Sequence, residues 1–163
     1  MDTQRLLGIY LNDHLTAATG GLDLFRRAAR GQQGTTTGAE LSALTEAVRE
    51  DRETLLALMR RLDVTVNRPM TLLGKVGERV GRLKPNGYVV RRSPLADVVE
   101  LEGLRDAVAA KTAGWQVLQV LAAHDDRIDR NEVDLLVARA DDQADRLRRL
   151  HLARTEELLA GPA

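Results

Sequence analysis

The chain has 163 residues, with 24 lysines and arginines balancing 24 aspartates and glutamates, no cysteine and 2% aromatic residues. This length favours a single domain, and the lack of cysteine excludes disulfides, thiolate metal sites and cysteine nucleophiles. Nucleic-acid-binding proteins usually carry a basic excess and aromatic side chains that stack on bases. The balanced charge and scarce aromatics therefore predict no sequence-specific nucleic-acid partner.

Two long amphipathic helices are predicted in the first part of the chain. Over residues 3–30, apolar side chains recur at spacings of three and four, which places them on one face of a helix. A loop rich in glycine and threonine follows over residues 31–38, and the second helix is predicted over residues 39–62. Each helix has one apolar face to bury against a partner.

A link of about 30 residues then separates the second helix from the next long one. Pro69 suits the first turn of a helix, and the apolar spacing predicts a short extra helix over residues 68–84. Such a helix covers about 25 Å at 1.5 Å per residue. The link is thus long enough to cross a bundle, so the third long helix could run parallel to the second.

Two further long helices are predicted over residues 93–123 and 129–159. Ser93 is a suitable N-cap with Pro94 at the first helical position, and Asp129 with Glu132 resembles a capping box. The β-structure signal is close to absent, with one possible short extended piece at Tyr88-Val89-Val90, and the sequence contains no transmembrane run or secretory signal. We therefore expect one all-α domain over residues 1–163, located in the cytoplasm.

Two helical hairpins joined by a long crossover resemble the ferritin-like superfamily of four-helix bundles. Active members of that superfamily hold a di-metal centre with glutamates and Glu-x-x-His motifs, and this chain contains no Glu-x-x-His. The resemblance therefore implies the fold, and we expect no catalytic site and no cofactor. The segments Tyr10-Leu11-Asn12-Asp13-His14-Leu15 and Ser93-Pro94-Leu95 are also similar to uncharacterised bacterial helical proteins.

Some polar residues fall on or beside the predicted apolar faces. Asp51 lies between Val48 and Leu55 on the second helix, Glu102 falls within a stripe of the third, and His14 flanks the stripe of the first. Their helical rise places them at similar heights in a bundle. Two interpretations stay open. His14, Asp51 and Glu102 form a degenerate site for iron, manganese, zinc or a small ligand, or they belong to a polar layer. In that layer His14 or Arg105 pairs with Asp51 or Glu102.

Charge is unevenly distributed along the chain. Residues 60–92 hold nine lysines and arginines against two acidic residues, whereas residues 93–145 hold twelve acidic residues against five basic ones. The basic link could contact an acidic protein partner, a membrane surface, nucleic acid or the acidic half of its own bundle. The candidate interaction residues in it are Arg79, Arg82, Lys84, Arg91 and Arg92.

The third long helix has apolar residues on two stripes, where a bundle helix usually needs one. One stripe passes through Leu95, Val98 and Ala109, and the other includes Trp115. Core burial is the default for Trp115, but the second stripe could also form a dimer surface, so Trp115 joins the candidate interaction residues. Taken together, these patterns favour a non-catalytic interaction module that forms a homodimer or binds another protein. The alternative is a protein that binds a metal or small ligand.

Overall fold

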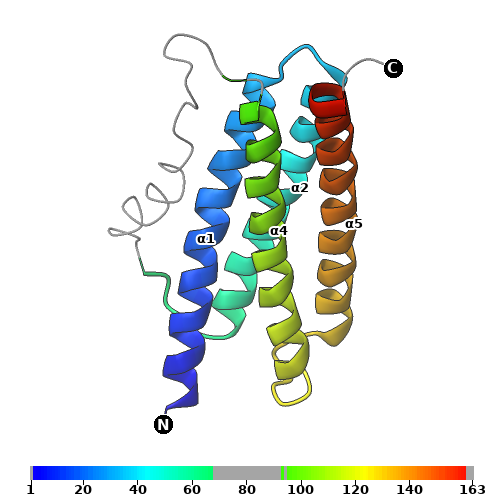
Figure 1. The fold of residues 1–163 in the computed structure, drawn as a ribbon. Helices are drawn as coiled ribbons and strands as arrows, with labels where there is room; N and C mark the ends of the chain where they lie inside the picture. The colour runs from blue at the N-terminus through cyan, green and yellow to red at the C-terminus, as the bar shows by residue number, and fades with distance from the viewer. Residues whose placement is uncertain (1, 68–92, 94, 161–163) are drawn as a thin grey trace.

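The computed structural model describes residues 2–67, 93 and 95–160, which form an all-α structure (Figure 1). Its long helices are α1 (Thr3–Gly31), α2 (Thr36–Arg61), α4 (Leu95–Leu121) and α5 (Arg130–Thr155), and a short π-helical segment, η1 (Glu156–Ala160), continues α5. No strand occurs among these residues, and none of these helices is long and apolar enough to cross a membrane. The predicted all-α bundle is confirmed. The predicted short helix over 68–84 and the basic residues Arg79, Arg82, Lys84, Arg91 and Arg92 lie outside the described residues.

Side-chain caps determine where three of the helices begin. At the start of α1, the Asp2 side chain accepts hydrogen bonds from the backbone N–H groups of Gln4 and Arg5. At the start of α5, the Asp129 side chain accepts them from the N–H groups of Asn131 and Glu132. Thr35 accepts a 2.9 Å bond from the N–H of Gly38, so α2 begins three residues before the predicted start. The loop between α1 and α2 is shorter than predicted for this reason.

The helices form two antiparallel hairpins, α1–α2 and α4–α5, packed side by side (Figure 1). Contacts at the two ends of the bundle give the direction of α4. Arg61 at the end of α2 pairs with Glu132 at the start of α5, whereas Asp97 at the start of α4 pairs with Arg154 at the end of α5. The third long helix of the chain, α4, therefore runs parallel to α2.

A polar layer interrupts the bundle core and separates two apolar clusters. One cluster includes Leu15, Leu55, Trp115 and Ala140, and the other includes Leu22, Val48, Val108 and Leu147. Between them, α2 contributes Asp51, α4 contributes Lys111 and α5 contributes Gln143. At the corresponding position α1 carries Ala18, midway between Leu15 and Leu22. Three helices thus supply polar groups to this layer, and the fourth supplies a methyl group.

Candidate ligand-binding site

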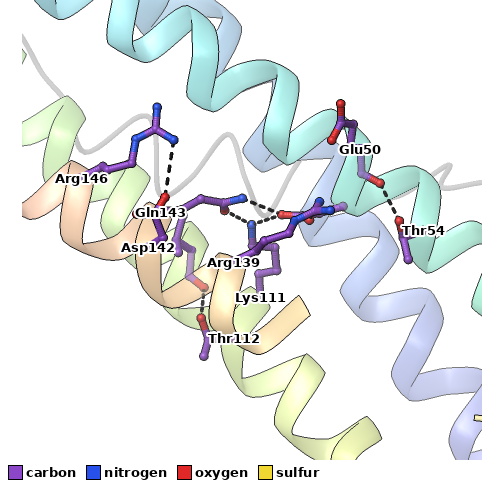
Figure 2. A network of polar contacts seen from close by, with 10 residues as sticks. Glu50, Thr54, Lys111, Thr112, Arg139, Asp142, Gln143 and Arg146 are labelled. Carbon is purple, nitrogen blue, oxygen red and sulfur yellow. Dashed lines mark hydrogen bonds and ion pairs between the residues drawn. The ribbon is translucent and has the colours of Figure 1, made fainter. Parts of the chain in front are cut away.

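Asp51 is the centre of the polar layer. Its side chain is 1% exposed, and both carboxylate oxygens accept hydrogen bonds from other helices. Arg139 donates to Oδ1, while Lys111 Nζ and Gln143 Nε2 donate to Oδ2 at 2.5 and 2.9 Å. Figure 2 shows the side chains of Lys111, Arg139 and Gln143 converging from α4 and α5. A buried carboxylate is tolerated only with such partners, and this one has both charge and hydrogen-bond compensation.

Lys111 completes the network from α4. Its ammonium donates to Asp51 and also to the amide oxygen of Gln143, which leaves one of its N–H bonds for another acceptor. Burial lowers the pKa of Lys111 by more than the neighbouring Asp51 raises it. Gln143 is 2% exposed and acts as donor to Asp51 and acceptor from Lys111. The amide therefore links the two charged groups.

A cavity of about 70 Å³ lies beside this layer, between α1, α2 and α4. Small residues of α1 and α4 contribute to its wall, including Ala17, Ala18, Ala107 and Ala110. The two helices approach closely at Gly21, where a Cβ atom would lie 3.6 Å from Ala107 Cβ. The cavity reaches from the exposed Ala17 and Ala110 inward to buried side chains. The inner and polar parts of its wall include Phe25, Asp51, Arg52, Lys111 and Trp115.

His14 forms part of the cavity wall on α1. Its ring lies 4.4 Å from that of Tyr10, measured between centroids, and it packs against Gly114. A Cβ atom on Gly114 would lie 2.8 Å from His14 Nδ1, so the glycine makes room for the imidazole. Burial lowers the pKa of His14 more than the charge of Asp13 raises it. The imidazole is therefore predominantly neutral at pH 7.

Two further side chains of the cavity wall carry hydrogen-bond donors. Trp115 is 3% exposed, and its indole Nε1 has no hydrogen-bond partner among the described residues. Arg52 uses Nε to donate to Thr19 Oγ1 at 3.0 Å, while its Nη groups have no partner in the described part of the chain. Trp115 thus belongs to the core, as its apolar stripe indicates, and its burial removes it from any surface of the bundle.

The structure separates the three residues predicted to form a metal site. His14 and Asp51 line the same cavity, but Glu102 lies on the exposed side of α4 and contacts His151 Nε2 at 3.2 Å. His151 Nδ1 in turn lies 2.9 Å from Arg105 Nη1. Within the described ranges, no group of three or more His, Cys, Asp or Glu residues is arranged to hold a metal ion.

The predicted polar layer is present, but its members differ from those predicted. Asp51 pairs with Lys111, Arg139 and Gln143 rather than with His14 or Arg105. A signal for Lys111 was available, because it is the single ionisable residue between Ala107 and Ala123. Gln143 likewise falls on the apolar stripe of α5 between Ala140 and Leu147. Nothing in the sequence singles out Arg52.

The chemistry of the cavity is suited to binding a ligand, and it shows no evident catalytic group. The buried ions are paired with each other, and the wall combines apolar surface with a few unused hydrogen-bond donors. Compared with known proteins, the chain matches no family model, no curated protein and no solved structure. Function has to be inferred from the chemistry of the cavity and of the exposed helix faces.

Proposed function

We propose that this protein binds a small molecule in the cavity between α1, α2 and α4. One observation carries the proposal: a single cavity connects the exposed Ala17 and Ala110 with the buried Asp51–Lys111 pair. Ligand sites are typically concave, mostly apolar and equipped with a few polar groups that orient the ligand. The parallel course of α2 and α4 supports the ferritin-like resemblance of the bundle around this site.

The cavity dimensions restrict the ligand to a small one. A volume of about 70 Å³ is well below the roughly 150 Å³ of an engineered cavity that binds benzene. A short aliphatic chain that extends toward Ala17 and Ala110 fits this space better than a ring. A metal ion is less favoured as the ligand, because both oxygens of Asp51 already accept hydrogen bonds from the protein.

The test uses Trp115, the sole tryptophan, as a reporter in the cavity wall. Butyrate, 1-butanol and butylamine share one carbon skeleton and differ in their polar group. We expect at least one of them to cause a saturable shift of the single indole N–H resonance of Trp115. Ala110→Leu should abolish that shift, because the larger side chain would fill the exposed end of the cavity.

Ala113→Leu is the matched control for Ala110→Leu. Both alanines are exposed on α4, but only Ala110 lines the cavity. The control variant should bind the same probe as the wild type does. A lack of saturable binding by all three probes, or equal binding by the two leucine variants, would refute the cavity as the site.

A second candidate function, self-association into a homodimer, is favoured by the outward face of α4. Between Ala107 and Ala123 the single ionisable residue is Lys111, and it is turned into the bundle. The exposed residues of this stretch include Ala109, Ala113, Val117 and Val120, the last of them 65% exposed. An uncharged face can pair with its own copy across a two-fold axis without leaving a charge unpaired. A second copy of the chain is therefore the proposed partner.

Sedimentation velocity over a range of concentrations tests this second candidate. We expect a dimer that dissociates on dilution, and we expect Val120→Glu to be monomeric because it places a charge in the centre of the contact. Leu152→Glu is the control, because Leu152 is 53% exposed on α5 and lies near Arg154. Arg154 pairs with Asp97 at the start of α4, the opposite end of that helix from Val120. A wild-type protein that stays monomeric at every concentration would eliminate the homodimer.

A further inference from the structure

The hydrogen-bonding capacity of the cavity wall is unbalanced. Asp51 is the one carboxylate among the described residues that line the cavity, and its two oxygens are already occupied by Lys111, Arg139 and Gln143. A cationic ligand would find no free carboxylate there. Of the other polar side chains of the wall, Tyr10 and the neutral His14 can both donate and accept hydrogen bonds, whereas Arg52, Lys111 and Trp115 can only donate.

Three donors of the wall remain unused. The indole Nε1 of Trp115 is buried and has no partner in the described part of the chain. Arg52 is half-buried and uses Nε for its hydrogen bond to Thr19, so its Nη groups can donate to a ligand. The ammonium of Lys111 retains one N–H bond beyond those given to Asp51 and Gln143. A ligand that satisfies these groups must bring acceptors, and an ionised carboxylate is an acceptor-only group with two oxygens.

The charges of the wall favour the same ligand. Arg52 and Lys111 line the cavity together with Asp51, and Arg139 reaches Asp51 from α5. The single negative charge is therefore outnumbered by positive ones. Arg52 has no ion-pair partner among the described residues. A bound anion could therefore neutralise the charge of its guanidinium without displacing another group.

We infer that the ligand is a short-chain organic acid bound as its carboxylate, with its aliphatic part in the cavity and its charged end at Arg52. This inference rests on the proposed function and adds the chemical class of the ligand. The alanine and glycine residues of the wall accommodate the aliphatic part. The carboxylate lies within reach of the Arg52 guanidinium, a group well suited to bind it.

The test compares butyrate, 1-butanol and butylamine by the shift of the Trp115 indole resonance at pH 7 and low salt. Hydrogen bonds to charged groups are stronger than neutral ones, so butyrate should bind about ten-fold more tightly than 1-butanol. Butylamine should bind most weakly. Butanol binding as tightly as butyrate, or butylamine binding most tightly, would overturn the carboxylate assignment and leave the cavity itself as the site. No binding of any probe would instead refute the proposed function.

Variants of Arg52 test the contact directly. Arg52→Gln should weaken butyrate binding by about ten-fold and leave 1-butanol binding unchanged. Arg52→Lys keeps the charge and should retain most of the butyrate affinity. Arg60→Gln is the matched control, because Arg60 is exposed on α2 and does not line the cavity. Equal losses for Arg52→Gln and Arg60→Gln would indicate a general effect of net charge and contradict the contact.

Discussion

Replacing Asp51 with alanine is expected to lower the free energy of unfolding by about 3–5 kcal/mol. The change leaves the Lys111 ammonium without its counter-charge in a largely buried position, since the Lys111 side chain is 12% exposed. It also removes the acceptor of the Gln143 amide. Urea unfolding followed by circular dichroism measures the loss, because the helical signal does not depend on the environment of Trp115.

Two comparisons isolate the cause of this loss. Asp145→Ala removes an exposed carboxylate whose one ion-pair partner among the described residues is the exposed Arg148, and such surface changes alter stability by about 0.5 kcal/mol or less. Combining Asp51→Leu with Lys111→Met replaces the buried pair by apolar side chains and should restore much of the stability. A loss below about 1 kcal/mol for Asp51→Ala would mean that Lys111 reaches water without its partner, contrary to the structure.

The second large effect is expected for Phe25→Ala. Phe25, the sole phenylalanine, is 1% exposed in the apolar cluster that includes Leu22 and Val48. Its truncation removes buried apolar surface and leaves a void, which together cost about 3–5 kcal/mol. Urea unfolding gives the loss, and Leu135→Ala is the control because Leu135 is 68% exposed. A loss similar to that of the control would show that the surrounding helices close the void.

Phe25 also lines the ligand cavity, so the same variant has a consequence for binding. The enlarged cavity should accept a longer aliphatic acid, and hexanoate should gain affinity relative to butyrate in Phe25→Ala. The wild type, with its smaller space, should show the opposite preference. The ratio of the two affinities depends on cavity shape and is independent of the overall loss of stability, provided that the variant is folded.

The sequence is sufficient to predict the helices and much of the core. Apolar spacing and capping residues are local properties, so the long helices and the cap of α5 at Asp129 follow from neighbouring residues. The burial of Asp51 also follows from its position between Val48 and Leu55. The start of α2 is less predictable, because the glycines and threonines over residues 31–38 are typical of a loop. Thr35 nevertheless caps the helix by accepting a hydrogen bond from Gly38.

Contacts between helices could not be predicted in the same way. A helical wheel shows which face is apolar but not which residue of another helix lies opposite it, so the partners of Asp51 on α4 and α5 were missed. The burial of Glu102 cannot be read from the pattern, because α4 has two apolar stripes. The structure buries the stripe with Leu104 and Trp115 and leaves Leu95 and Glu102 outside. The rotation of each helix about its own axis decides which stripe is buried, and that rotation depends on the packing of the whole bundle.

The division of the core into two apolar clusters also has a consequence for unfolding. Neither cluster is continuous with the other, since the charged layer around Asp51 lies between them. Amide hydrogens in the two halves of the bundle can therefore exchange through separate partial openings rather than through one global event. A ligand seated beside Ala18 and Phe25 would contact both halves at once. Its binding would couple these openings and make the unfolding of the bundle more cooperative.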